Sequence, residues 1–177
     1  GFNELESRQD TSGGMTDTLR RLTLKALVGV MLAPEVASAQ PKGERRMPSL
    51  AKGTFTVEIK PQTEPDTADG VSLGRMSLDK RFEGDLVATG KGEMLTALTP
   101  VKSSAGYVAI ERVTGTLQGR NGSFVFQHSG IMDQGAQQLS ITVVPGSGTG
   151  ALAGISGVFK INITGGAHFY EFEYSLP

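Results

Sequence analysis

The chain has 177 residues, with 24 glycines, 6% aromatic residues, no cysteine and a formal net charge of −1. The length suits one domain with a sizeable core, and the glycine content favours strands and turns over helices. The low charge and the lack of a basic stripe after residue 52 argue against a nucleic-acid surface, which needs clustered Lys and Arg. Without cysteine there is no disulfide, thiolate zinc site or thiol nucleophile. Two histidines are too few for a multi-histidine metal site, and a metal site that combines histidine and carboxylate ligands is the one kind not excluded. We expect no metal and no cofactor.

The first 51 residues read as segments outside the domain. Residues 1–14 show no period and precede Met15, so we take them as upstream sequence. Residues 15–39 have a basic start, the apolar run 26–33 and small residues before Gln40, which together predict a secretory signal peptide. A permanent membrane span is not expected, because it needs roughly 20 apolar residues. We expect a periplasmic or secreted protein if Met15 is the start and a cytoplasmic one if Met47 is the start.

Residues 40–51 are polar with two prolines and read as a linker, so residues 52–177 form the predicted domain. Alternating apolar and polar residues predict strands over 54–59, 76–82, 86–98 and 139–143, and a final hairpin across Gly165-Gly166. The glycines at 90 and 92 indicate a bend or bulge inside their strand. The glycine-rich connection 145–154 has room for one short helical turn.

The longest predicted hairpin covers residues 103–132, with its turn within Gly119-Arg120-Asn121-Gly122. We consider two registers, which pair residues 120 and 123 or residues 119 and 122. In both, Glu111 and His128 share one face. They lie two or four residues apart along the hairpin, roughly 7 or 13 Å. The same face carries three aromatic residues, Tyr107, Phe124 and Phe126.

About eight strands joined mostly by short turns, with no helix of domain length after residue 52, predict an all-β fold. An eight-stranded antiparallel up-and-down β-barrel is favoured because closure removes the exposed strand edges. The interior of such a barrel is either filled by side chains or holds one small ligand.

Four segments carry a resemblance to a known family. They are FEGDLVATGKGEML (82–95), SAGYVAIERVTGTLQGRNGSFVFQHSG (104–130), VVPGSGTGALAGISG (143–157) and HFYEFEYSLP (168–177). Over residues 50–177 the chain resembles an uncharacterised bacterial family of small domains with the allene oxide cyclase-like, calycin-like barrel fold. The resemblance implies the fold and a homo-oligomer, but it implies no particular reaction because a fold does not fix function.

Glu111 and His128 are the candidate catalytic residues. A carboxylate facing a barrel interior carries a desolvation cost of several kcal/mol unless it is paired. Glu111 therefore either orients His128 as a general acid or base, or forms an ion pair with Arg112 or Lys102 at the rim, or lies on a face that points outward. His128 can equally be a hydrogen-bonded core residue.

The expected ligand-binding residues lie on the apolar faces of the two long hairpins. They are Tyr107, Phe124, Phe126, His168, Tyr170 and Tyr174. An apolar wall with a few polar groups is typical of a small-ligand pocket. A phosphate loop at 147–154 is rejected because no lysine and no strand-to-helix unit frame it.

Three functions remain open from the sequence. The leading prediction is a binding protein that holds a small apolar or amphipathic molecule inside the barrel. The second is a cofactor-independent isomerase or cyclase that uses Glu111 and His128. The third is a solid structural barrel that binds nothing.

Overall fold

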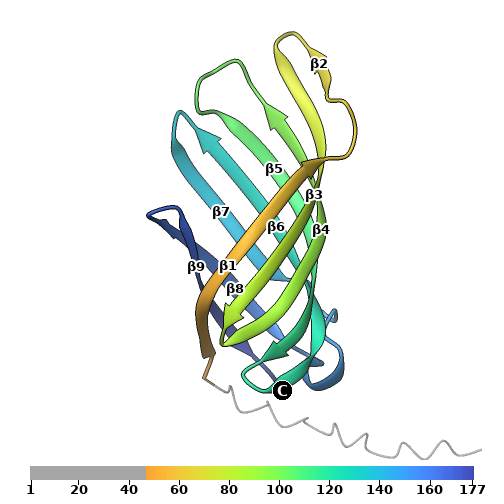
Figure 1. Cartoon of the computed structure of the whole chain (residues 1–177), viewed down its shortest axis with the longest axis vertical. Coiled ribbons are helices and arrows are strands. Elements are labelled where there is room, and N and C mark those ends of the chain that lie inside the picture. The colour runs from red at the N-terminus through yellow and green to blue at the C-terminus, as the bar shows by residue number, and fades with distance from the viewer. Residues whose placement is uncertain (1–46) are drawn as a thin grey trace, which may run out of the picture. The chain divides into compact units, whose positions relative to one another are not determined.

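Nine antiparallel strands make up most of residues 47–177, which are the residues that the computed structural model describes (Figure 1). The predictions for residues 1–46, the signal peptide among them, lie outside the described residues. The strands are β1 (Ser49–Pro61), β2 (Asp66–Ala68), β3 (Val71–Gly84), β4 (Leu86–Leu98), β5 (Ala105–Leu117), β6 (Arg120–Asp133), β7 (Ala136–Val143), β8 (Ser156–Thr164) and β9 (Ala167–Ser175).

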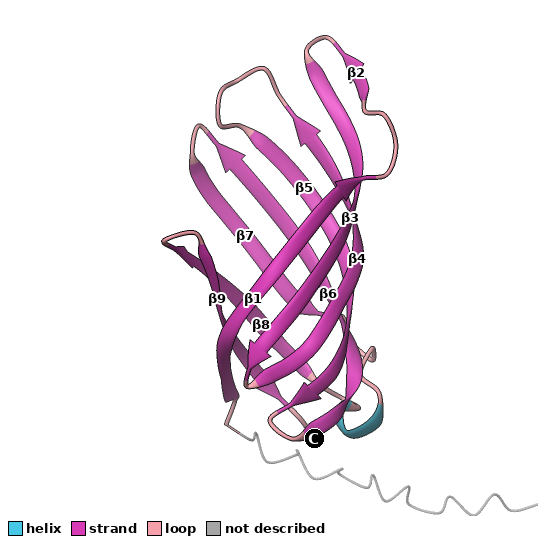
Figure 2. Ribbon diagram, in the orientation of Figure 1, coloured by secondary structure: helices cyan, strands magenta, loops and turns pink. Residues whose placement is uncertain are grey.

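The first long strand closes the sheet into a barrel. β1 pairs with β9 on one side and with β3 on the other, while β3 to β9 pair in chain order. The short β2 pairs only with β3 and extends one hairpin. Figure 2 shows strand and turn almost throughout, and the one helical turn, η1 (Gly150–Leu152), lies in the predicted glycine-rich connection. The prediction of an all-β, eight-stranded antiparallel barrel is therefore confirmed.

Alternation of inward and outward residues along the strands separates the barrel interior from its surface, most clearly toward the packed end. On β4, for example, Leu86 and Ala88 are buried while Val87 and Thr89 are exposed. β1 begins at Ser49, within the segment predicted as a linker. Among the described residues, no helix has the length and apolar character needed to cross a membrane.

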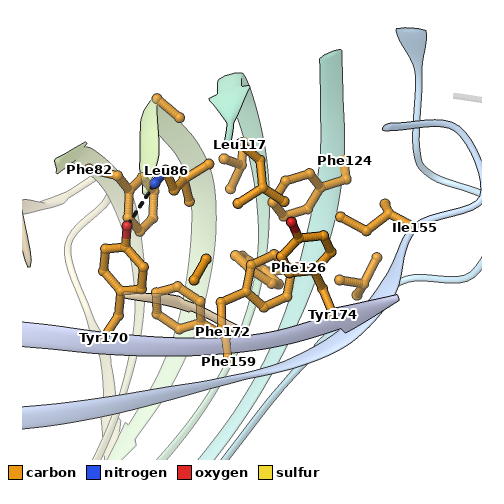
Figure 3. Packing of buried hydrophobic residues seen from close by; sticks show 14 of the residues in the cluster. Phe82, Leu86, Leu117, Phe124, Phe126, Ile155, Phe159, Tyr170, Phe172 and Tyr174 are labelled. Atoms are coloured by element: carbon orange, nitrogen blue, oxygen red, sulfur yellow. Dashed lines mark hydrogen bonds between the residues drawn. The ribbon is translucent and has the colours of Figure 1, made fainter. Parts of the chain in front are cut away.

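The interior is filled with aromatic rings at the end of the barrel where the β3–β4 and β5–β6 turns lie (Figure 3). The Phe159 ring lies 5.0 Å from the Phe126 ring and 5.1 Å from the Tyr170 ring, and Phe124 stacks on Phe172 at 5.6 Å. Burying each such side chain contributes roughly 1.5–3 kcal/mol. We call this the closed end of the barrel.

The central hairpin turns earlier than predicted. Leu117 pairs with Arg120, so the turn residues are Gln118 and Gly119, whose positive φ angles of 45° and 82° suit a primed two-residue turn. The predicted turn within 119–122 is therefore wrong. Gly122 lies instead in β6, where a Cβ atom would collide with the carbonyl oxygen of Thr149. The correct register differs from both predicted ones by an even number, so the predicted faces stay the same.

Two predictions about glycines have opposite outcomes. The final hairpin turns at Gly165-Gly166, with φ of 59° and 81°, as predicted. No bulge occurs at Gly90 or Gly92, because β4 pairs with β3 and β5 in one unbroken register. These two glycines have a different role, described below.

Candidate functional site

The other end of the barrel contains a cavity of about 370 Å³. Most of its wall is apolar, and it comes from all the strands except β2, with Leu78, Met94, Leu139 and Ile161 among the lining residues. The volume lies at the small end of the range for ligand sites, roughly 300–1,000 Å³. The interior is thus neither full nor open throughout: one end is packed and the other is hollow.

Three charged or polar residues meet where the cavity ends against the core. Lys80 and His128 line the cavity, and Glu111 lies behind them with no exposed surface. The Lys80 Nζ atom donates a hydrogen bond to Glu111 Oε2 at 2.8 Å. The His128 Nε2 atom lies 3.0 Å from the same oxygen. We call these three residues the floor triad.

Two glycines allow the triad to form across a strand. β4 runs between β3 and β5, and its inward positions between Lys80 and Glu111 are Gly90 and Gly92. A Cβ atom on Gly90 would collide with Glu111 Oε1, and one on Gly92 would lie 2.8 Å from the Glu111 Cα atom. Since neither position has a side chain, the lysine reaches over β4 to the carboxylate.

The hairpin register brings His128 to the carboxylate. Ala109 lies opposite His128 and Phe126 lies opposite Glu111, so the histidine and the glutamate are diagonal neighbours on one face. The contact has ion-pair distance, but the ring is not aligned for a hydrogen bond, and Nε2 and Glu111 Oε1 make none. The second ring nitrogen, Nδ1, is not buried in this way, and the residue lines the cavity.

Burial and neighbouring charge act in opposite directions on Glu111. Burial alone raises the pKa of Glu111, but the contact with His128 and the positive charge of Lys80 outweigh it and hold the pKa below its ordinary value. The carboxylate is therefore ionised at neutral pH. At Tyr107, burial and then the Glu111 charge raise the pKa of the phenol, so its hydroxyl stays protonated.

The predicted site residues fall into two groups. Tyr107 and His168 line the cavity together with His128, and Glu111 contacts the histidine from behind. The other four predicted ligand-binding residues are buried in the aromatic core and do not line the cavity: Phe124, Phe126, Tyr170 and Tyr174. Both of these tyrosines use their hydroxyls within the fold. Tyr170 receives a hydrogen bond from the Leu86 backbone at 2.9 Å, and Tyr174 donates one to Gln118 at 2.7 Å.

The sequence interpretation missed Lys80, the ionic partner of Glu111. Arg112 and Lys102, the partners considered from the sequence, are both exposed. A signal for Lys80 existed, because it falls in phase with the inward residues Leu78 and Phe82. A lysine at an interior position requires a buried counter-charge, and Glu111 is the matching inward carboxylate.

Within residues 47–177, no three or more His, Asp and Glu side chains gather in a way that could hold a metal ion. The floor triad has one carboxylate and one imidazole, with an ammonium group beside them that would repel a cation. Its chemistry is that of proton transfer and hydrogen bonding.

The fold and site define a class: a closed eight-stranded antiparallel barrel with a hollow end and a buried lysine, glutamate and histidine at its floor. The chain belongs to the family described as protein of unknown function (DUF3224), whose profile matches residues 51–174. It is similar to the crystal structure of a DUF3224 family protein of unknown function from Shewanella oneidensis MR-1. The two are 51% identical with a TM-score of 0.71, and the match covers 73% of this chain and 98% of that one. No curated protein matches the chain. The relation to allene oxide cyclases stays a prediction.

Proposed function

We propose that the barrel binds one small amphipathic molecule in the cavity at its hollow end. The main support for this proposal is the cavity itself, which has a volume of about 370 Å³, an apolar wall and charged groups confined to its floor. A solid structural barrel would have no reason to keep a hollow end beside a buried lysine and histidine. Both groups are costly to bury, and an apolar core of the same size would be as stable or more so.

The distribution of polar atoms supports one orientation for the proposed ligand. Lys80 and His128 at the floor suit a hydrogen-bonding head group, and Tyr107 and His168 offer further polar contacts on the wall. The mouth carries apolar side chains that are more than half exposed, such as Leu98, Ile131 and Ile163. We infer that the apolar body of the ligand covers these side chains while the head group reaches the floor.

A route into the cavity lies between β7 and β8. Their ladder is limited to one pair, Thr142 opposite Val158, which lies toward the closed end. Beyond it the two strands diverge, as Figure 1 shows, and residues of both strands line the cavity. This seam can widen at less cost than the other strand pairs, which have seven or more paired positions each around the barrel.

Native mass spectrometry of the protein purified from its own host tests the proposal. A retained small molecule supports it and supplies a ligand candidate. The same spectrum gives the assembly state and the first residue of the mature chain, and so tests the expected homo-oligomer and the signal peptide that ends before Gln40.

A filled-cavity variant tests the location with a defined probe, 2-acetylnaphthalene, whose fluorescence reports binding. Ile161→Trp places an indole in the cavity and should weaken binding at least tenfold. Lys160→Trp is the matched control, because residue 160 is the neighbouring position on β8 and points outward. Equal binding by both variants, or no binding by the unmodified protein, contradicts the proposed site.

A further inference from the structure

His128 presents an unusual pair of ring nitrogens. Nε2 is buried at 3.0 Å from Glu111 Oε2, while Nδ1 is not buried in this way and belongs to a ring that lines the cavity. When a carboxylate holds the proton on one nitrogen of a neutral imidazole, the other nitrogen carries a lone pair. The Nδ1 lone pair is then directed to the place where the head group of a ligand would lie.

We propose that the cavity floor is a proton-transfer site: His128 Nδ1 removes a proton from the carbon beside a carbonyl group of a bound ketone or aldehyde, and Lys80 stabilises the enolate oxygen that forms. This inference rests on the proposed function, because it needs a molecule bound in the cavity. It adds a substrate class, a reaction and a role for Lys80.

Glu111 is a positioning residue in this scheme, and it does not touch the substrate. Its Oε2 atom is occupied by Lys80 and His128, and its Oε1 atom is buried beside Gly90. The pairing also keeps it ionised. A fixed negative charge behind His128 stabilises the imidazolium that forms when the ring accepts a proton. The loose alignment of the His128 contact agrees with a ligand-free site, because such contacts often tighten when substrate binds.

Lys80 is placed to stabilise the negative charge that forms on the enolate oxygen. Its ammonium group has three N–H donors, and the structure assigns one of them to Glu111. The group lies 5.1 Å from the Phe55 ring centre and 5.7 Å from that of Phe82, at a position that lines the cavity. A positive charge in such an apolar setting stabilises a developing oxyanion more strongly than it would in water.

The step balances without any further reagent. The C–H bond breaks, its proton forms an N–H bond at Nδ1, and its electron pair forms the carbon–carbon double bond of the enolate. The carbonyl π electrons move onto oxygen, beside Lys80. Return of the proton to the same carbon regenerates the substrate, and return to a conjugated carbon gives an isomer.

Hydrogen–deuterium exchange of 2-acetylnaphthalene in deuterium oxide tests the inference. The methyl hydrogens beside its carbonyl exchange through the enolate, and mass spectrometry measures the rate, while fluorescence measures binding of the same probe. With saturating probe we expect the protein to raise the exchange rate above that of buffer. His128→Gln should lower the protein-dependent rate roughly 100-fold or more, the usual scale for a general base.

Glu111→Gln separates positioning from binding. We expect it to lower the exchange rate of bound probe roughly tenfold or more with little change in the dissociation constant, which a purely structural role would not produce. Glu93→Gln is the matched control, since Glu93 lies on the outward face of β4 in an exposed pair with Arg75. It should exchange as the unmodified protein does.

The outcomes distinguish the two proposals. No binding of the probe overturns the proposed function and this inference with it. Binding without exchange, or exchange that His128→Gln leaves unchanged, overturns this inference alone. If His128→Gln does not fold, His128→Phe keeps a ring at the position and is read by the same criteria.

Discussion

The Oε1 atom of Glu111 occupies the space that a side chain at position 90 would need. Gly90 lies directly opposite Lys80 on β3, so the absence of its side chain also opens the path by which the lysine reaches the carboxylate. One glycine thus accommodates both halves of a buried ion pair. The floor triad is therefore sensitive to substitution of Gly90, although this residue has no side chain that could take part in the chemistry.

Gly90→Ala should destabilise the barrel. The added methyl group collides with Glu111 Oε1 and comes within 3.1 Å of the Phe82 ring. The carboxylate cannot move away freely, because Lys80 and His128 hold its other oxygen. Overpacking of this kind costs about 1–3 kcal/mol in the free energy of unfolding, which urea denaturation measures.

Gly106→Ala is the control for that experiment. Gly106 also lies within a strand, but the nearest atom to an added Cβ is 3.9 Å away and its φ angle is not in the left-handed region. We expect no loss of stability, or a gain of up to about 1 kcal/mol from the reduced freedom of the unfolded chain. Equal effects of the two alanines would show that the space beside Glu111 is not what Gly90 provides.

Single and double variants of the buried pair should not be additive. Glu111→Gln leaves the Lys80 charge without its partner, and Lys80→Met leaves the buried Glu111 charge with only the His128 contact, so each should cost about 3–5 kcal/mol in unfolding free energy. The double variant removes both charges and should recover much of that loss. Urea unfolding of the four proteins gives the coupling energy, and a value near zero would contradict the pairing seen in the structure.

Local patterns in the sequence correctly predicted which residues share a face of the sheet. A strand places alternate residues on opposite sides, so Glu111 and His128 could be assigned to one face even though the turn was placed wrongly. The final hairpin was placed correctly because its Gly-Gly turn has only one sensible register. Both results depend on residues that are near in sequence.

Contacts between residues far apart in the sequence could not be predicted from such local patterns. The partnership of Lys80 with Glu111 spans 31 residues and depends on β4 having glycines at its inward positions. Those glycines look the same in a sequence as glycines that form a bulge. The division into a packed and a hollow end likewise depends on how aromatic rings from five strands fill the interior, which the pattern of a single strand does not predict.

Acid should destabilise the protein in part through Glu111. Its pKa in the folded state lies below the ordinary value of 4.5, because the contacts with His128 and Lys80 outweigh the opposing effect of burial. The carboxylate therefore binds protons less readily when folded than when unfolded. Its contribution to stability is complete above about pH 4.5 and is lost as the pH falls through the folded pKa.

The comparison that isolates this effect is between the unmodified protein and Glu111→Gln. Urea midpoints measured from pH 7 down to about pH 3 should converge, because the glutamine variant lacks the titrating group. Exposed carboxylates such as Glu171, whose pKa is also lowered, by its pairing with Lys52, are present in both proteins and cancel. A constant difference between the two midpoints across this range would refute the assignment.

Tyr170→Phe should affect stability but not ligand binding. The Tyr170 hydroxyl accepts a hydrogen bond from the Leu86 backbone N–H at 2.9 Å and donates one to the Glu83 carbonyl at 3.2 Å, which fixes the β3–β4 turn to β9 at the closed end. Without this hydroxyl the buried Leu86 N–H has no partner, at a cost of about 1–3 kcal/mol in the free energy of unfolding.

Tyr107→Phe is the matched change in the cavity wall. Its hydroxyl makes no hydrogen bond within residues 47–177, so its removal should leave the unfolding free energy within about 0.5 kcal/mol of that of the unmodified protein. Urea denaturation and 2-acetylnaphthalene fluorescence on both variants check the contrast, and weaker probe binding by Tyr170→Phe would show that the closed end contributes to the ligand site after all.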